Sequence, residues 1–251
     1  MEFGEERSIK ADIKRAIRKE AFFGCAICGN PIIEYHHIEP FSKVKCHETD
    51  NLIALCPTHH YKADRGMVPK DQLLQLKQNP YNKSKEIIKD DFFLGNYDVL
   101  EFRAGSNTFI RTPDLFVIDN FPLISVYKDE FNNAVINAKF FDKSSILIAE
   151  IVDNEWITYL GEDMVWDIQY SGGRLKVNSD KGKVFLEFYS NPEHNYVELK
   201  ANLYYKGHFF DIKPSKVTVG VEQPKSPIEM MISGNTTVDC QIGMYISSSN
   251  L

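Results

Sequence analysis

Two short pairs of Cys and His residues constrain the fold of this chain more than any other feature of its sequence. Two residues separate Cys25 from Cys28, and two separate Cys56 from His59. Two such pairs can supply the four ligands of a tetrahedral zinc site that is closed to water and therefore structural. Residues 25–66 are rich in Cys and His but poor in apolar side chains. We therefore expect a metal ion to hold this stretch together.

The cysteine count favours metal binding over disulfides. The chain has five cysteines, an odd number, and three of them belong to the two pairs. The charged N-terminus lacks the apolar run of a secretion signal, so a reducing compartment is expected. Cys46 and Cys240 lack ligand spacing and are expected to be ordinary thiols. One alternative stays open, because the adjacent Cys46 and His47 could replace His59 at the zinc.

A second set of His residues lies among the zinc ligands. His36 and His37 are adjacent, and neighbouring side chains on an extended strand point to opposite sides. One of them can therefore bind a metal while the other acts as a base near neutral pH. On a helix, His60 is rotated by about 100° from His59 and must face elsewhere. We expect His60 to share a metal with one of the two adjacent histidines.

Two further polar residues are candidates for the same site. Asp64 stands one helical turn beyond His60 and on its face, where it is either a metal ligand or an ordinary surface acid. Asn51 carries both a donor and an acceptor, so it can fix the loop that bears the base. The alternative for Asn51 is a turn or helix-cap residue.

The pattern of apolar residues predicts helices first and strands later. Isoleucines at spacings of four predict an amphipathic helix over 8–21, with Ser8 as its cap, and short helices are expected at 56–65 and 71–77. From residue 92, about ten short runs rich in β-branched and aromatic residues alternate with turn residues. Such runs are typical of a sandwich or a barrel-like sheet.

These elements predict an α+β chain with two domains. A small domain stapled by zinc is expected at 1–78 and an all-β sandwich or barrel-like domain at 92–221. Residues 79–91 are polar, with Pro and Asn, and are expected to be a linker. Residues 222–251 are expected to be a second linker and a tail.

The charge of the chain is unevenly distributed. Its net charge is −6, but residues 1–90 hold 15 Lys and Arg against 13 Asp and Glu, while the remainder hold 14 against 22. The first part can therefore contact phosphates, and the acidic second part is not expected to bind them unspecifically. The candidate phosphate contacts are Arg15, Arg18, Lys19, Lys43, Lys45 and Lys62. No apolar run approaches the length of a membrane span, so a cytoplasmic location without membrane contact is expected.

The ordered run of CAIC, EYHHIEP, NLIALC and CPTHH, over about residues 20–66, resembles the ββα-metal motif of HNH endonucleases. The resemblance implies that His36 and His60 bind a catalytic metal, that His37 is the general base, and that Asn51 orients the base. The zinc-ribbon subset of the family has four structural ligands, which match Cys25, Cys28, Cys56 and His59. His59 stands where the family more often has Cys, and Asp64 where some members have a third His ligand.

The resemblance further implies hydrolysis of phosphodiester bonds in DNA with one divalent ion, namely Mg²⁺, Mn²⁺, Ni²⁺ or Zn²⁺. Lys43, Lys45 and Lys62 are the expected DNA contacts, and defence against foreign DNA is the expected context by analogy with such nucleases. The β-rich domain is expected to serve recognition, regulation or assembly, with a small molecule, a protein or DNA as its partner. The alternative is a zinc-ribbon module that binds nucleic acid or protein without catalysis. The sequence leaves the oligomeric state open.

Overall fold

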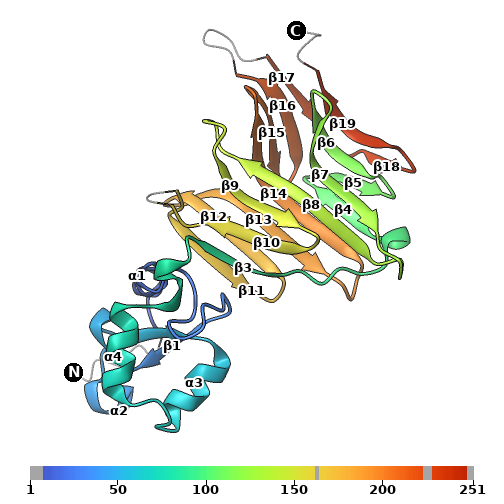
Figure 1. Cartoon of the computed structure of the whole chain (residues 1–251). Coiled ribbons are helices and arrows are strands. Elements are labelled where there is room, and N and C mark those ends of the chain that lie inside the picture. The colour runs from blue at the N-terminus through green and yellow to red at the C-terminus, as the bar shows by residue number, and fades with distance from the viewer. Residues whose placement is uncertain (1–7, 162–163, 223–227, 248–251) are drawn as a thin grey trace, which may run out of the picture.

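The chain folds into a small N-terminal unit of helices and two short strands, followed by a much larger unit of β-strands (Figure 1). The computed structural model describes residues 8–161, 164–222 and 228–247. The α+β arrangement expected from the sequence is confirmed, and the large unit is a sandwich rather than a barrel.

A β-hairpin followed by a helix forms the centre of the N-terminal unit. β1 (Glu34–His37) pairs antiparallel with β2 (Leu52–Leu55), and α3 (Pro57–Asp64) begins directly after β2. Pro57 suits the first turn of α3, where its missing N–H is not needed. In the described part of the chain, no helix is long and apolar enough to cross a membrane. The other elements of the unit are α1 (Ala11–Glu20), α2 (Phe41–Val44), α4 (Lys70–Gln78) and two 3₁₀ helices, Thr49–Asn51 and Tyr81–Ser84.

Helix α1 packs against the hairpin through its isoleucines, as their spacing predicted. Ile17 is fully buried in one cluster with Leu52, and Ile9 and Ile13 pack beside this cluster. The helix begins at Ala11, after Lys10 in an extended conformation, and no side chain caps it. The prediction that Ser8 caps this helix is therefore wrong.

The N-terminal unit has little apolar core of its own. Apart from Phe23, its buried apolar side chains fall into two small clusters, one around Leu55 and Leu73 and the other around Ile17 and Leu52. By contrast, one continuous core fills the β unit. A unit with so small a core needs another source of stability, as the sequence predicted for residues 25–66.

Short strands with tight turns make up the β unit. Many of the turns place Asn, Asp or Gly in the left-handed region, as at Asn154 and Gly173. The strands are β3 (Ile87–Asp91), β4 (Glu101–Ala104), β5 (Asn107–Ile110), β6 (Asp114–Ile118), β7 (Phe121–Lys128), β8 (Ala134–Phe141), β9 (Leu147–Val152), β10 (Glu155–Tyr159), β11 (Asp167–Ser171), β12 (Arg174–Asp180), β13 (Lys183–Asn191), β14 (Tyr196–Tyr205), β15 (His208–Lys213), β16 (Lys216–Val221), β17 (Ile228–Ile232), β18 (Thr236–Val238) and β19 (Ile242–Ile246), with a 3₁₀ helix at Tyr97–Val99.

These strands form two sheets that share one core. The first sheet has the order β19-β6-β7-β8-β9-β10-β3, and the second runs β11-β12-β13-β14-β15-β16-β17. β4 pairs with β14, and β5 joins β4 to β18. Aromatic side chains from both sheets meet between them, including Phe116 and Phe140 from the first sheet and Phe188 and Phe210 from the second. Apolar and polar residues alternate along the strands because one face of each sheet packs on this core and the other faces outward.

Two segments that were expected to be linkers contribute strands. Residues 79–91 contain a 3₁₀ helix and β3, the last strand of the first sheet. An edge strand tolerates the Lys and Asp residues that made this segment look like a connector. Residues 222–251, expected to be a linker and a tail, contribute β17, β18 and β19. Of this segment, residues 223–227 and 248–251 lie outside the described residues.

A buried ion pair joins the two units. Arg18 on α1 donates to both carboxylate oxygens of Asp167 on β11, at 2.9 and 2.6 Å, and the two side chains are 11% and 2% exposed. The same guanidinium donates to the Tyr35 hydroxyl on β1 at 2.6 Å. Arg15 lies over the ring of Trp166, 3.6 Å from its centre, and donates to the Trp166 carbonyl.

The junction changes the interpretation of two basic residues. Arg15 and Arg18 were expected to be available to phosphates, and this expectation is wrong because their guanidinium groups bind the β unit. Phe23 follows α1 and is buried in the core of the β unit. The two units are therefore packed together rather than tethered by a flexible segment.

We expect Asp167→Ala to lower the free energy of unfolding by about 3–5 kcal/mol, because it leaves the Arg18 guanidinium buried without its counter-charge. Urea unfolding followed by tryptophan fluorescence measures the effect, and Trp166 lies at the junction. Asp239→Ala is the control, because Asp239 pairs with Arg111 at the exposed surface and its loss should change stability little. Equal stabilities for Asp167→Ala and the wild type would contradict the assigned junction.

Candidate functional site

Helix α3 carries metal-binding side chains on two of its faces. Cys56, directly before its first turn, and His59 belong to one cluster, while His60 and Asp64 belong to another. Successive residues of an α-helix are rotated by about 100°, so the adjacent histidines cannot face the same ion. The two clusters that the sequence predicted are thus separated by the geometry of one short helix.

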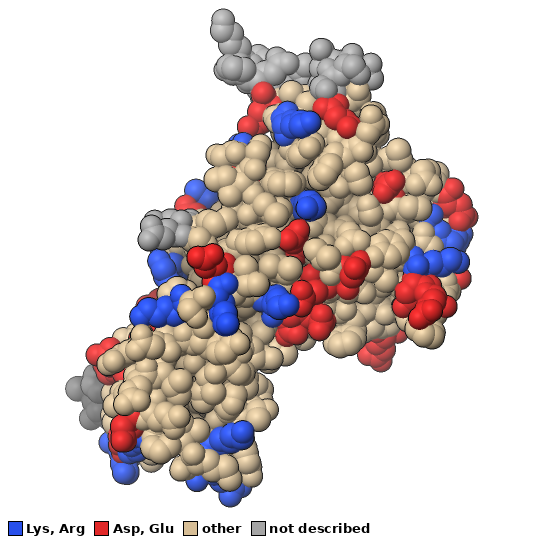
Figure 2. Space-filling view, in the orientation of Figure 1, with Lys and Arg blue, Asp and Glu red and all other residues tan. Residues whose placement is uncertain are grey.

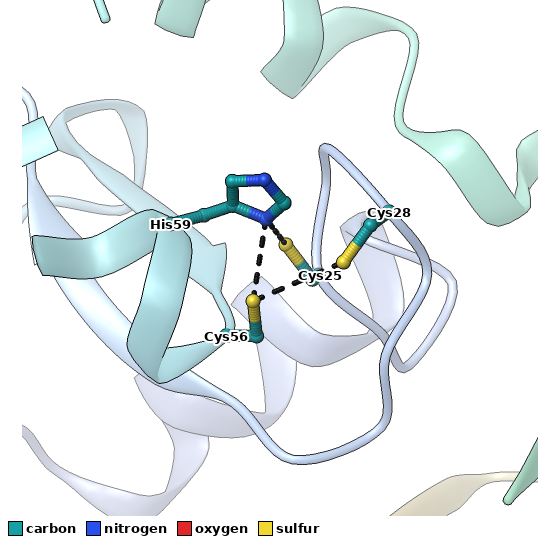
Figure 3. A group of neighbouring side chains, drawn as sticks. All are labelled: Cys25, Cys28, Cys56 and His59. Atoms are coloured by element: carbon teal, nitrogen blue, oxygen red, sulfur yellow. Dashed lines mark hydrogen bonds between the residues drawn. The ribbon is translucent and has the colours of Figure 1, made fainter. Parts of the chain in front are cut away.

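The side chains of Cys25, Cys28, Cys56 and His59 point toward one another (Figure 3). The Sγ atoms of Cys28 and Cys56 are 3.8 Å apart, and Nδ1 of His59 lies 3.4 Å from Cys25 Sγ and 3.2 Å from Cys56 Sγ. Around tetrahedral zinc, neighbouring ligand atoms are separated by about 3.8 Å for two sulfurs and about 3.5 Å for sulfur and nitrogen, given bonds of about 2.3 and 2.0 Å. The cluster therefore fits a zinc ribbon.

Asn82 holds the loop that carries the first two cysteines. Its buried side chain donates to the carbonyl groups of Phe22 and Gly29, both at 3.2 Å. Gly29 has a φ of +78°, and a Cβ there would collide with the Asn82 side chain, so this turn requires glycine. Asn82 lies in the segment that the sequence presented as a connector, and it instead supports the metal-binding loop.

The chemistry of the cluster also suits a cation. Burial raises the pKa of the Cys25 thiol and that of the Cys28 thiol. Metals bind the thiolate form of cysteine. A buried thiolate is not stabilised by water, and the positive charge of a bound ion stabilises it instead. The fourth member of the cluster is His59, whereas the alternative ligand His47 lies beside His37.

A second cluster contains the imidazoles of His36 and His60 and the carboxylate of Asp64. Asp64 places one oxygen 3.1 Å from Nδ1 of His36 and the other 3.3 Å from Nδ1 of His60. Glu34 adds an oxygen 3.2 Å from the same His60 nitrogen. Glu34 and His36 are two residues apart on β1, so their side chains leave the strand on the same side and reach α3 together.

This second cluster opens into a cleft of about 580 Å³. The cleft is lined by β1, α3 and the residues that lead into α4, and both His37 and Lys70 are among its lining residues. Burial and the neighbouring His60 lower the pKa of His36, while Asp64 acts in the opposite direction. The neutral imidazole that a metal requires is thereby favoured near neutral pH.

Asn51 closes the irregular segment between β1 and β2. Its side-chain oxygen accepts from the Glu39 N–H at 2.7 Å, and its side-chain nitrogen donates to the Glu39 carbonyl at 2.9 Å. Its own carbonyl accepts from the N–H of Ile38 at 2.9 Å. The side-chain amide thus holds the backbone of Glu39, two residues after His37.

His37 lines the cleft and contacts two other rings. Its Nε2 lies 3.0 Å from Nδ1 of His47, and its ring centre is 5.3 Å from that of Phe41. Burial is the main cause that lowers the pKa of His37, and the nearby His47 and His36 lower it further, while a hydrogen bond of the ring with the Cys46 backbone acts in the opposite direction. A neutral imidazole with a lone pair is the form that a general base needs.

The three lysines expected to contact DNA are exposed. Lys43 lies 3.0 Å from the Glu39 carboxylate, which Lys70 also contacts. Lys62 lies on α3, and Lys45 directly follows α2. Lys43 and Lys70 therefore share one acidic partner close to the cleft.

Three residues were not predicted near the second cluster from the sequence, namely Glu34, His47 and Lys70, and His47 was considered only as an alternative zinc ligand. Glu34 could have been predicted, because it precedes His36 by two residues on the expected strand and their side chains therefore point to the same side. The spacing of His47 gives no such signal, because the segment between β1 and β2 has no regular period. The place of Lys70 depends on how the chain turns after α3, which the sequence pattern does not fix.

The family comparison agrees with this geometry. Residues 25–65 match the family model described as HNH endonuclease. Over these residues the chain is similar to that family. The matched residues include both clusters of α3, His37 and Asn51, but none of the β unit. Comparisons with curated proteins and with solved structures found no match.

We expect the purified chain to contain one zinc per molecule, and Cys56→Ser to lose it and to unfold the HNH domain. Structural zinc contributes on the order of 10 kcal/mol to small metal-folded units, so removal of one ligand is severe. Cys240→Ser is the matched control, because Cys240 is exposed and lies outside the cluster. Elemental analysis and circular dichroism test this, and a folded Cys56→Ser protein without zinc would contradict a structural site.

Proposed function

We propose that this protein is a metal-dependent DNA endonuclease whose catalytic ion is held by His36, His60 and Asp64. The observation that carries the proposal is the second cluster itself. A zinc ribbon needs only the Cys and His cluster, yet this chain places a separate set of metal donors beside His37 in one cleft. A metal ligand set next to a neutral imidazole is what hydrolysis of a phosphodiester requires.

The donors of the second cluster suit a divalent ion. Adjacent ligands of an octahedral ion are about 3.0 Å apart when the metal–ligand bonds are about 2.1 Å. The contacts of Asp64 and Glu34 with the two histidines, at 3.1, 3.3 and 3.2 Å, are close to this spacing. Glu34 contacts His60 but does not belong to the group of His36, His60 and Asp64, and we propose it as an additional donor beside His60. Carboxylate ligands favour Mn²⁺ and Mg²⁺, whereas imidazole ligands favour Ni²⁺ and Zn²⁺, so this mixed set of donors suits all four ions.

The residues around the ion divide the work of hydrolysis. A bound divalent ion supplies stabilisation of the negative charge that develops on the scissile phosphate. His37 takes the proton of the attacking water, and Asn51 keeps the backbone after His37 in place. Lys43, Lys45 and Lys62, together with Lys70, contact DNA phosphates around the cleft.

The β unit has another task than phosphate binding. Its share of the net charge is strongly negative, and it is joined to the HNH domain through Arg18 and Asp167. We propose that it binds a small molecule or a protein and acts on the nuclease across this junction. A cytoplasmic location and a role in defence stay predictions that no contact in the structure bears on.

The second candidate function is a zinc-ribbon module that binds nucleic acid or protein without cleaving it. Such a module would use the Cys and His cluster alone and would have no need of His36, His37 or His60. Incubation of the full chain with supercoiled plasmid and Mg²⁺, Mn²⁺, Ni²⁺ or EDTA separates the two functions. Nicked or linear product that disappears with EDTA supports the nuclease.

We expect His37→Ala to abolish plasmid cleavage but to keep the affinity for Mn²⁺, since it removes the base and no ligand. His60→Ala should lose both plasmid cleavage and the affinity for Mn²⁺, since it removes a proposed metal ligand. His194→Ala is the control, because His194 is exposed on the β unit and its loss should change neither property. Cleavage by His37→Ala at the wild-type rate would show that another group takes the proton.

The assignment of Glu34 has its own test. Glu34→Gln should weaken Mn²⁺ binding to the full chain by about 10-fold or more, measured by calorimetry on protein that retains its zinc. Glu48→Gln is the matched control, with the same change of charge at an exposed residue of the same unit, whereas Glu34 contacts His60. If both variants bind Mn²⁺ as the wild type does, then Glu34 is not a ligand.

A further inference from the structure

His37 and His47 form a pair of imidazoles at the edge of the cleft. The two ring centres are 5.1 Å apart, and Nε2 of His37 is 3.0 Å from Nδ1 of His47. This distance is that of a hydrogen bond, so one of the two nitrogens carries a proton and the other accepts it. The direction of this hydrogen bond therefore decides which nitrogen of His37 keeps its lone pair.

The position of His47 is itself fixed by packing. Its ring stacks on that of Phe41, with centres 4.8 Å apart and planes inclined by 13°. Phe41 also contacts the ring of His37, so the three rings form one half-buried group. Asn51 holds the backbone of Glu39, shortly before Phe41. His47 is thus supported by the same segment that orients His37.

We propose that His47 is a positioning residue that accepts the Nε2 proton of His37 and so leaves Nδ1 of His37 unprotonated as the base. This inference rests on the proposed nuclease function of the cleft. A neutral imidazole has one N–H and one lone pair, and the partner of one nitrogen sets the state of the other. With Nε2 turned to His47, Nδ1 is the nitrogen left to take a proton from water.

One further observation supports this role. His47 is not among the residues that line the cleft, whereas His37 is. His47 therefore acts on the reaction through His37 and not by contact with the substrate.

The experiment compares His47→Leu with His47→Gln in the full, zinc-containing chain. Leu fills similar space and can pack on Phe41 but accepts no hydrogen bond, whereas the Gln side-chain oxygen can accept the Nε2 proton. We expect His47→Leu to lower kcat by about 10- to 100-fold with KM unchanged, and His47→Gln to restore most of that loss. His194→Leu makes the same substitution at an exposed site on the β unit and should change nothing.

The second readout does not depend on activity. Long-range ¹H–¹⁵N correlation spectra of the imidazoles distinguish the two tautomers of His37, whose signals are assigned by their loss in His37→Gln. We expect the tautomer protonated at Nε2 in the wild type and in His47→Gln, and a mixture of tautomers in His47→Leu. Zinc content confirms that each variant is folded.

The outcomes separate this inference from the nuclease proposal. A wild-type His37 protonated at Nδ1 would overturn the inference, and so would an unchanged tautomer and kcat in His47→Leu. If the wild type cleaves no DNA but the tautomer responds to His47→Leu as expected, the pairing is correct and the nuclease proposal fails.

Discussion

The placement of helix α3 depends on the four side chains that meet at its N-terminus. Cys56 stands before the first turn and His59 lies within it, so the cluster with Cys25 and Cys28 fixes both the start of the helix and its rotation. The apolar clusters of this unit are small, and a metal site can contribute more to its stability than they do. Once α3 is fixed, His60 and Asp64 have only one direction in which to point.

Strand β1 connects the second cluster to the rest of the molecule. Glu34 and His36 leave the strand toward α3, while Tyr35 leaves it on the other side and accepts a hydrogen bond from Arg18. Arg18 is bound in turn by Asp167 of the β unit. A change in the β unit that moved Asp167 would thus reach the strand that carries the proposed metal ligands and base. The junction is a physical route by which a partner of the β unit could act on the cleft.

The sequence predicted those features that depend on spacing along one element. The two clusters of α3 follow from the rotation between adjacent helical residues, and the change to strands near residue 92 follows from a change in period. Contacts between distant segments were not predictable in this way. The ion pair of Arg18 with Asp167 and the contact of His37 with His47 depend on how loops and units pack, and neither has a repeat or a spacing. Edge strands were also missed, since their exposed faces resemble the polar composition of a linker.

Anomalous diffraction from crystals of the full chain soaked in Mn²⁺ tests the central claim, which is that one helix separates a structural zinc from a catalytic ion. Data collected on both sides of the zinc edge locate zinc, and data at longer wavelength locate manganese. We expect a zinc peak enclosed by Cys25, Cys28, Cys56 and His59, and a separate manganese peak between His36, His60 and Asp64. A zinc peak with no manganese at the second cluster, or zinc bound by Cys46 or His47, would contradict this division.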